Sequence, residues 1–226
     1  MTLNIADNLK SVQKKINKSC DLWNVDAKDI QLIAVSKKQP DEKIDAMLDA
    51  GHRIYGENRV QDAILRWGER KKQFEDLQLH LIGPLQSNKV AEAVALFDAI
   101  HTVDRPKLVK ALIKEISAQG KIVSCFIQVN TGEESQKSGV VPEEFAALFQ
   151  CCKEEGLIIS GLMCIPPEDE PPAHHFALLR KIAETHGLKD LSMGMSSDFE
   201  KAIPLGIKGG HVFIRVGSAL FGAREY

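Results

Sequence analysis

Residues 31–57 read QLIAVSKKQPDEKIDAMLDAGHRIYGE and contain one complete strand–helix–strand unit. A β-rich apolar run at 31–37 is followed, from Pro40, by a segment whose apolar residues recur at helical spacing. A second β-rich run occupies residues 52–57. Strands that are almost continuously apolar are typical of a parallel sheet covered on both faces. This unit therefore predicts an α/β protein built on parallel strands.

The same alternation of β-rich runs and helical segments continues to the end of the sequence. The further β-rich runs are LHLIGP (79–84), DAIHTVD (98–104), VSCFIQVN (123–130), ISGLMCI (159–165), LSMGMS (191–196) and HVFIRVG (211–217). Eight strands that alternate with helices in 226 residues predict one closed (β/α)₈ barrel of the TIM type. An open doubly wound sheet is the alternative, but it would seldom need eight strands at this length.

One domain spanning residues 1–226 is expected, because no linker, low-complexity tract or short repeat interrupts the alternation. Residues 1–22 precede the first strand and carry apolar side chains on one helical stripe. We expect this extra N-terminal helix to pack on the barrel.

Two segments carry the signals of helix starts. Asn58 precedes Gln61, and Ser197 precedes Glu200, at the three-residue spacing of a capping box. In such a box the first side chain accepts a hydrogen bond from a free backbone N–H of the first helical turn. The spacing predicts that Asn58 and Ser197 cap the helices after the second and seventh strands.

The composition limits the kinds of partner that this chain can have. Lys and Arg number 29 and Asp and Glu number 31, so the net charge of −2 gives no electrostatic signature for nucleic acid or anionic lipid. No apolar run is long enough to span a membrane, and the polar N-terminus lacks a signal-peptide core. Five irregularly spaced cysteines argue against a disulfide framework and predict a reducing, cytoplasmic location. The scattered His and Cys residues form no zinc signature.

The first β-rich run ends in Ser36-Lys37-Lys38. A lysine that emerges from an apolar run is unusual, because burial of an unpaired ammonium group is costly. One interpretation is an imine-forming lysine: desolvation favours the neutral, nucleophilic amine and lowers the pKa from its reference of about 10.4. The other interpretation is a strand end whose two lysines reach solvent.

Small and hydroxyl-bearing residues close the seventh and eighth β-rich runs, at SMGMS (192–196) and RVGSA (215–219). Glycine lets a phosphate approach the backbone, and the free amides at a helix start favour negative charge. The loops after strands seven and eight are also where barrels commonly place a phosphate. Ser196 and Ser218 therefore indicate a phosphate site or, alternatively, simple helix caps. In a closed barrel the first strand lies beside the eighth, which brings Lys37 to the same place.

Arg215 lies two residues before Gly217. If its side chain points into the mouth of the barrel, it would lie beside the pyridine nitrogen of a bound cofactor. Arginine stays charged and only donates hydrogen bonds, so it would keep that nitrogen unprotonated and weaken the ring as an electron sink. The alternative is an ion pair with a neighbouring carboxylate.

Six runs of the sequence resemble the pyridoxal phosphate homeostasis protein family: AVSKKQP, YGENRVQDA, HLIGPLQSNK, QVNTGEESQKSG, LSMGMSSDFEKAI and RVGSALFGAREY. That family is similar to the barrel domain of fold-type III enzymes such as alanine racemase. The resemblance extends from about residue 30 to the C-terminus, in order and at several independent motifs. It implies a barrel that holds the vitamin B6 cofactor pyridoxal 5′-phosphate.

The resemblance also implies a role for each candidate site residue. Lys37, the lysine directly after Ala34-Val35-Ser36, would form the Schiff base, although Lys38 beside it leaves the attachment point open. The other implied residues are Ser196, Gly217 and Ser218 for the phosphate, Arg215 for the pyridine nitrogen, and Asn58 near the cofactor. Lys89 and Lys137 lie in loops after strands three and five, and either attract a phosphate or are ordinary surface lysines.

Three functions compete on this basis. The first is reversible binding of pyridoxal phosphate, to buffer it or deliver it to pyridoxal-phosphate-dependent apo-enzymes. The second is a pyridoxal-phosphate-dependent amino-acid racemase of fold type III. The third is a barrel enzyme that acts on a phosphorylated substrate and uses Lys37 directly.

The sequence favours cofactor handling over catalysis, so no catalytic residue is assigned. Fold-type III racemases carry a second, β-rich domain that supplies an acid/base tyrosine, and none is expected here because the sequence stops at Tyr226 soon after the eighth strand. Tyr55 lies inside the second strand and is no obvious proton donor. The third function lacks a carboxylate base at the strand ends apart from Glu57 and Asp104. A monomer is expected.

Overall fold

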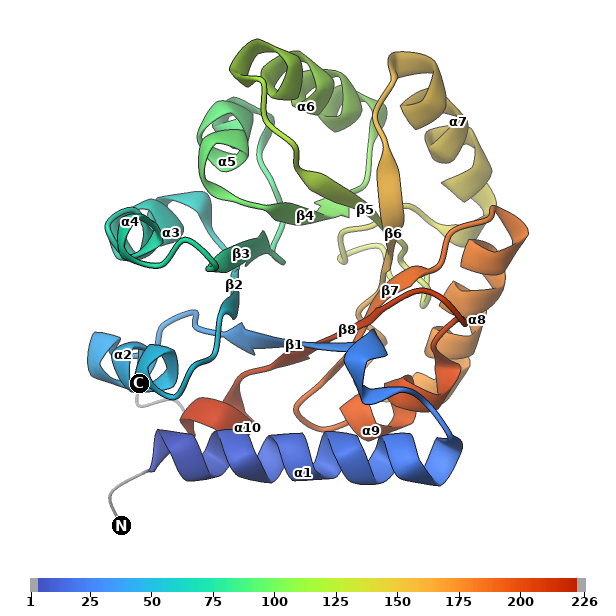
Figure 1. Ribbon diagram of the computed structural model, residues 1–226. Coiled ribbons are helices and arrows are strands. Elements are labelled where there is room, and N and C mark those ends of the chain that lie inside the picture. Colours follow the sequence, from blue (N-terminus) through green and yellow to red (C-terminus); the bar gives the residue numbers. More distant parts are fainter. Residues whose placement is uncertain (1–3, 223–226) are drawn as a thin grey trace.

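The computed structural model describes residues 4–222, in which eight parallel strands close into a barrel in the order β1 to β8 (Figure 1). The ring closes where β8 pairs with β1, with Ile33 in register with Arg215. The predicted (β/α)₈ fold is confirmed. The strands are β1 (Ile30–Val35), β2 (Ile54–Glu57), β3 (Gln78–Leu81), β4 (Ala99–Val103), β5 (Ser124–Gln128), β6 (Ile159–Met163), β7 (Asp190–Met195) and β8 (Val212–Val216).

Helices surround the barrel and bury the outer face of its sheet (Figure 1). The longer ones are α1 (Ile5–Trp23), α2 (Asp41–Asp49), α3 (Val60–Trp67), α5 (Val90–Leu96), α6 (Pro106–Gln119), α7 (Phe145–Glu155) and α8 (Pro172–Thr185). The short ones are α4 (Arg70–Gln73), α9 (Phe199–Ala202), α10 (Ser218–Phe221), η1 (Ala27–Asp29), η2 (Ser87–Lys89), η3 (Pro142–Glu144) and η4 (Ile203–Leu205). Each helix presents a stripe of apolar side chains to the strands: in α2 the stripe is Ile44, Met47 and Leu48, all buried.

The helix α1 precedes the barrel and lies along its outside, against α10, α2 and η4. It begins where the side chain of Asn4 accepts a hydrogen bond from the backbone N–H of Asp7. It ends at Asn24, whose left-handed backbone stops the helix. Its buried stripe includes Val12 and Ile16.

Both predicted capping boxes are wrong. The helix α3 begins at Val60, so Asn58 lies before the cap position, in chain that continues from β2. The cap position of α9 is Asp198, and the Asp198 side chain turns back to accept the backbone N–H of Met195. After β2 the backbone of Asn58 lies against Gly83, and after β7 the bond between Asp198 and Met195 closes a turn before the helix, so loop packing and turn geometry override the capping signal.

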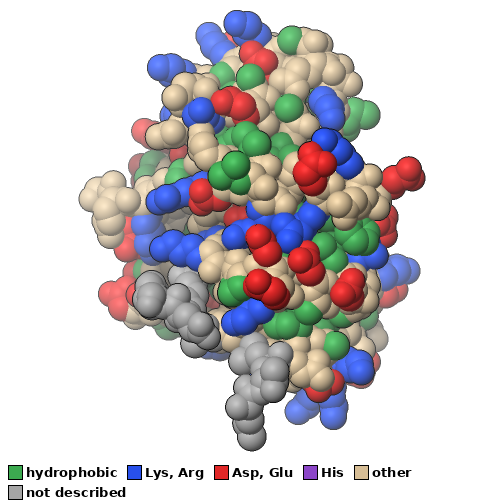
Figure 2. All heavy atoms as spheres, turned by 90° about the vertical axis from the view of Figure 1, so that its left-hand side faces the viewer, with side chains coloured by type: hydrophobic (Ala, Val, Ile, Leu, Met, Phe, Trp, Pro, Cys, Tyr) green, Lys and Arg blue, Asp and Glu red, His purple; other side chains and the backbone are tan. Residues whose placement is uncertain are grey.

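The outer surface carries charges of both signs. On the face in Figure 2, Lys and Arg side chains lie among Asp and Glu side chains. Among residues 4–222, no helix combines the length and the apolar character that a membrane crossing requires.

Candidate functional site

A cavity of about 470 Å³ opens at the carboxyl ends of β1, β7 and β8. Barrels of this type place their chemistry at this end of the strands. Apolar walls come from Val35, Ile82, Ile165 and Met195, which can enclose a flat ring. The structure brings all six predicted site residues to this one cavity: Lys37, Asn58, Ser196, Arg215, Gly217 and Ser218.

The two adjacent lysines have different positions. Lys37 is half-buried and lines the cavity directly after β1. Lys38 is exposed, and its left-handed backbone (φ 57°) turns the chain away from the strand. Ser36, before them, is buried and donates a 2.7 Å hydrogen bond to Glu57. The turn is therefore anchored with Lys37 facing the cavity.

The phosphate side of the cavity is built from the loops after β7 and β8. The Ser196 hydroxyl oxygen accepts the backbone N–H of Gly217 at 3.1 Å, so its own proton is available for a ligand. Ser196 is thus not a helix cap, and neither is Ser218, which is the first residue of α10 and is exposed. Among residues 4–222, a Cβ added at Gly217 would meet no atom closer than 3.5 Å. Packing among these residues does not require a glycine here, and its lack of a side chain leaves room for a ligand to approach the backbone.

Arg215 forms the inner wall of the cavity and is 5 % exposed. It donates to the Ser192 hydroxyl at 2.7 Å and to the backbone carbonyl of Cys164 at 2.8 Å. Among the described residues no carboxylate pairs with it, so the ion-pair alternative is wrong. Burial lowers the pKa of the Arg215 guanidinium, but arginine remains a cation. A buried, oriented positive charge therefore faces the cavity.

The bonds of Arg215 continue through the inside of the barrel along a chain of polar side chains. His101 Nδ1 lies 2.8 Å from the Ser192 hydroxyl, and His101 Nε2 lies 3.1 Å from Nδ1 of His80. In the tautomer of His101 that carries its proton on Nε2, the Ser192 hydroxyl accepts from Arg215 and donates to His101 Nδ1, and His101 donates to His80. Burial lowers the pKa of His80 to about 4 and that of His101 well below its ordinary value. Both imidazoles are neutral at pH 7.

Sequence reasoning missed this chain of side chains. The histidines stand on β3 and β4 and the serine on β7, far apart in sequence. The available signal was that each of these residues alternates with apolar neighbours in a strand, which marks an inward-facing position.

Asn58 supplies an unsatisfied group. Its Oδ1 atom is buried and has no hydrogen-bond partner within the described part of the chain. A buried acceptor that makes no hydrogen bond costs free energy, so such an atom indicates a place where a ligand donates a hydrogen bond. Together with a lysine amine, phosphate donors and an arginine, this atom gives the cavity the groups that pyridoxal phosphate requires.

The two carboxylates named as possible bases are already engaged. Glu57 is 1 % exposed and accepts hydrogen bonds from Ser36, from Arg66 Nη1 at 3.1 Å and from Trp67 Nε1 at 3.1 Å. Asp104 pairs with Arg105. Neither carboxylate lines the cavity at Lys37, which argues against a phosphorylated-substrate enzyme that uses them.

Lys89 and Lys137 do not line the cavity that contains Lys37. Lys137 donates to the carbonyl of Pro166 and pairs with Glu134. Lys89 pairs with Glu92 at 3.0 Å and lines a separate cavity.

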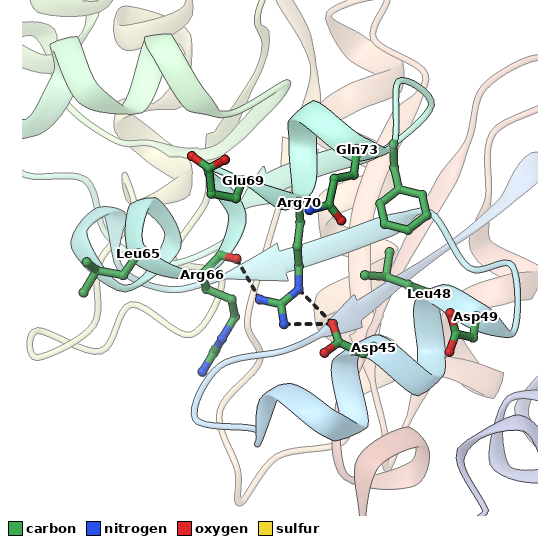
Figure 3. Close-up of a pocket in the computed structure, with 9 residues that line it drawn as sticks. Asp45, Leu48, Asp49, Leu65, Arg66, Glu69, Arg70 and Gln73 are labelled. Carbon is green, nitrogen blue, oxygen red and sulfur yellow. Dashed lines mark hydrogen bonds and ion pairs between the residues drawn. The ribbon is translucent and has the colours of Figure 1, made fainter.

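Another cavity, of about 460 Å³, lies outside the barrel between α2, α3 and α4 (Figure 3). Its charged groups bond to one another: Arg70 donates to Asp45 and to the carbonyl of Arg66, each at 2.8 Å. These bonds tie α2 to α3 and α4, and no strand end contributes to the lining. This cavity is a structural junction of three helices.

The fold and the site together define a class, the barrel related to the N-terminal domain of alanine racemase. The family model "Alanine racemase, N-terminal domain" matches residues 3–225. An alanine racemase from Clostridium difficile has a similar fold, with a TM-score of 0.71 at 14% identity over 99% of this chain and 57% of that one.

Curated relatives narrow the class to one family. The pyridoxal phosphate homeostasis protein of Pseudomonas aeruginosa is 38% identical over 98% of this chain and 96% of that protein. The protein of the same name from Haemophilus influenzae is 34% identical over 99% of this chain and 98% of that protein. PipY of Synechococcus elongatus, solved with pyridoxal phosphate bound, is 33% identical with a TM-score of 0.80, covering 96% of this chain and all of that one. The chain belongs to the pyridoxal phosphate homeostasis protein family.

Proposed function

We propose that this chain binds pyridoxal 5′-phosphate reversibly through Lys37 and serves intracellular homeostasis of the cofactor by buffering or delivering it. The proposal rests on the meeting of separate chain segments at one cavity. Six residues from four segments, after β1, β2 and β7 and at the end of β8, meet at one cavity, where they supply an amine, phosphate donors, a buried cation and a buried acceptor that has no partner among the described residues. The bound cofactor in PipY supports the same assignment by relationship.

Each group of the cavity has a separate task. Ser196, Ser218 and the backbone at Gly217 bind the phosphate, because hydroxyl and amide donors meet there. Arg215 orients the ring from its nitrogen side. Asn58 accepts a hydrogen bond from the cofactor's polar edge. When bound, pyridoxal phosphate supplies an aldehyde that condenses reversibly with amines.

We propose further that the protein does not racemise amino acids, because Tyr55, the tyrosine among residues 4–222, does not line the cavity at Lys37. Tyr55 is fully buried, donates to the carbonyl of His52 and packs on Trp67. Burial raises the pKa of the Tyr55 phenol. A racemase needs a group whose pKa and position suit proton transfer at the substrate, and Tyr55 has neither. Tyr226 lies outside the described residues.

The finer aspects of the role are proposals as well. Pyridoxal-phosphate-dependent apo-enzymes would be the recipients of the cofactor, the protein would act as a monomer, and its location would be the cytoplasm. The five cysteines are all free thiols, which suits a reducing compartment.

Reduction with borohydride followed by peptide mass spectrometry tests the attachment point. The protein is loaded with pyridoxal phosphate, reduced and digested. The expected product is a pyridoxyl group on Lys37, absent from Lys37→Ala and retained in Lys38→Ala. A label on Lys38, or spread over surface lysines, would contradict the proposal. Recovery of activity by a pyridoxal-phosphate-dependent apo-enzyme mixed with the unreduced protein tests delivery, and a racemase assay on the same sample tests the alternative.

A further inference from the structure

A second cavity near the cofactor site has no role in the function proposed above. It measures about 730 Å³ and lies beside the cavity at Lys37, with Asn58 lining both. Its walls come from the starts of α3, α5 and α6, which stand next to one another around the barrel (Figure 1). This volume is typical of a site for a small molecule.

The six runs that carry the family resemblance divide between the two cavities. AVSKKQP, LSMGMSSDFEKAI and RVGSALFGAREY supply most of the lining around Lys37. YGENRVQDA and HLIGPLQSNK supply most of the lining of the second cavity, and QVNTGEESQKSG adds Ser138. Two of these runs reach both cavities, because Asn58 of YGENRVQDA and Ile82 of HLIGPLQSNK also line the cavity at Lys37.

Three cations line the second cavity: Arg59, Lys89 and Arg105. Arg59 and Arg105 occupy the cap positions of α3 and α6, Lys89 lies where η2 continues into α5, and none makes a side-chain capping bond. An arginine is a poor choice at a cap position, because the start of a helix favours Asp, Asn, Ser or Thr and is itself electropositive. Helix stability does not explain three cations in one cavity, whereas binding of an anion does.

The cations keep donors available for a ligand. The guanidinium of Arg105 donates to Asp104 and, at 2.8 Å, to the backbone carbonyl of Leu85. These bonds use two of the five N–H groups of Arg105. Lys89 uses one of three donors on Glu92. Arg59 makes no side-chain hydrogen bond or ion pair within residues 4–222. Asp104 is the one carboxylate in the lining, so the cations outnumber it.

Close contacts tie together the segments beside this cavity. Gly83 lies so close to the backbone of Asn58 that an added Cβ would come within 2.3 Å of the Asn58 carbonyl oxygen. The buried Thr102 hydroxyl, on β4, donates to the carbonyl of Gly83 at 2.9 Å. The loops after β2 and β3 are therefore held to each other and to β4, which limits the movement of the cations relative to one another.

We propose that this second cavity binds a small molecule that carries carboxylate or phosphate groups, and that Arg59, Lys89 and Arg105 hold those groups. Arginine forks match both kinds of anion, and paired charged hydrogen bonds are the strongest available. The site differs from the phosphate position of the cofactor, which lies between the loops after β7 and β8. The inference goes beyond the proposed function and shares only Asn58 with it.

Calorimetric titration at constant ionic strength tests the proposal, with pyrophosphate and succinate as separate probes. The protein is first loaded with pyridoxal phosphate, and loading is read from its absorbance, so that the cofactor's own phosphate position is filled. We expect saturable binding of one equivalent of at least one probe. Arg59→Gln and Arg105→Gln should each weaken it about tenfold, the effect of one charged hydrogen bond. The matched control is Lys121→Gln, an exposed lysine before β5, which should leave binding unchanged.

The possible failures are separable. Absence of saturable binding in the loaded protein, or equal weakening by Lys121→Gln, would overturn the proposal. Binding of a polyglutamate peptide but of neither small probe would overturn it in favour of an acidic protein partner. If Arg105→Gln does not fold, Arg59→Gln still tests the proposal, because the Arg59 side chain has no partner among the described residues that the substitution could remove. If the cofactor does not bind, the proposed function fails, and the same titration of Ser196→Ala still tests the second cavity.

Discussion

Buried polar atoms decide where this protein binds its ligand. Asn58 has an orphan acceptor, Arg215 has a buried charge without a carboxylate among the described residues, and Ser196 has an unused proton. Each would carry a cost in a closed core, and each faces the same cavity. Their costs are offset together when one ligand bearing a phosphate and a polar ring occupies that cavity.

Ser196→Ala removes a hydroxyl that accepts from the backbone N–H of Gly217 and that we propose donates to the cofactor's phosphate. A hydrogen bond to a charged group contributes about 1.5–3 kcal/mol, so the affinity for pyridoxal phosphate should fall roughly ten- to hundredfold. An absorbance titration measures it. Ser124→Ala, an exposed serine at the amino end of β5, serves as the control, and equal affinities for the two variants would exclude Ser196 from the site.

The two neutral histidines predict a pH dependence of stability. Their pKa values are lowered in the folded protein, to about 4 for His80, so the unfolded chain binds more protons below its ordinary pKa of 6.5. Their contribution to stability is complete above pH 6.5 and is lost as the pH falls toward 4. Between pH 6.5 and 5.5 the loss is about 1 kcal/mol for each histidine.

Urea unfolding of the wild type and His80→Phe at pH 6.5 and 5.5 measures this difference. The variant should lose about 1 kcal/mol less than the wild type over that interval, whatever its absolute stability. Identical losses would mean that His80 is already charged, or solvated, in the folded barrel. His211→Phe, at an exposed histidine, controls for the substitution itself.

The strands and long helices were predictable from the sequence because their signals are local. Apolar β-rich runs gave the eight strands, and helical spacing gave the helices between them. The structure ends most strands one or more residues earlier than the apolar pattern does, as at β1, which stops at Val35 while the apolar run leads on to Lys37. The chain turns there so that Lys37 can enter the cavity.

The site was predictable in part, and the missing part has a physical reason. Lys37, Ser196 and Gly217 follow strands whose carboxyl ends must meet in a closed barrel, so their meeting follows from the fold. The cap at Asn58 was mispredicted, and the bonds from Arg215 to His80 were missed. The bonds join β8, β7, β4 and β3, and the Asn58 backbone packs against Gly83 of the next loop, so both depend on contacts between segments that spacing within one segment does not encode.

The junction of β2 with α3 rests on one buried carboxylate. Glu57 accepts from Ser36, Arg66 and Trp67. In Glu57→Gln the half-buried Arg66 loses its buried charge partner and keeps only the exposed Asp41, at 3.4 Å, so the free energy of unfolding should fall by about 2–3 kcal/mol. Chemical denaturation checks this, with Glu69→Gln as the control because its side chain is 80% exposed in its ion pair. A loss no greater than that of the control would show that Glu57 does not hold the junction.

The whole molecule is expected to remain a monomer with and without its cofactor. Its exposed large apolar side chains lie on separate elements: Leu22 and Trp23 at the end of α1, Ile64 and Leu65 on α3, and Ile122 and Ile158 before β5 and β6. Scattered apolar residues of this kind are normal for a protein surface. Sedimentation should give a mass near 25.0 kDa at micromolar concentration, and a stable species of twice that mass would contradict the expectation.

The central claim is that the mouth of this barrel holds pyridoxal phosphate on Lys37. An absorbance spectrum of the purified protein, recorded beside Lys37→Ala and Lys38→Ala after incubation with the cofactor, tests it most directly. We expect a near-visible absorbance band in the wild type and in Lys38→Ala, and no such band in Lys37→Ala. A wild type without the band, or a band that survives in Lys37→Ala, would contradict the claim.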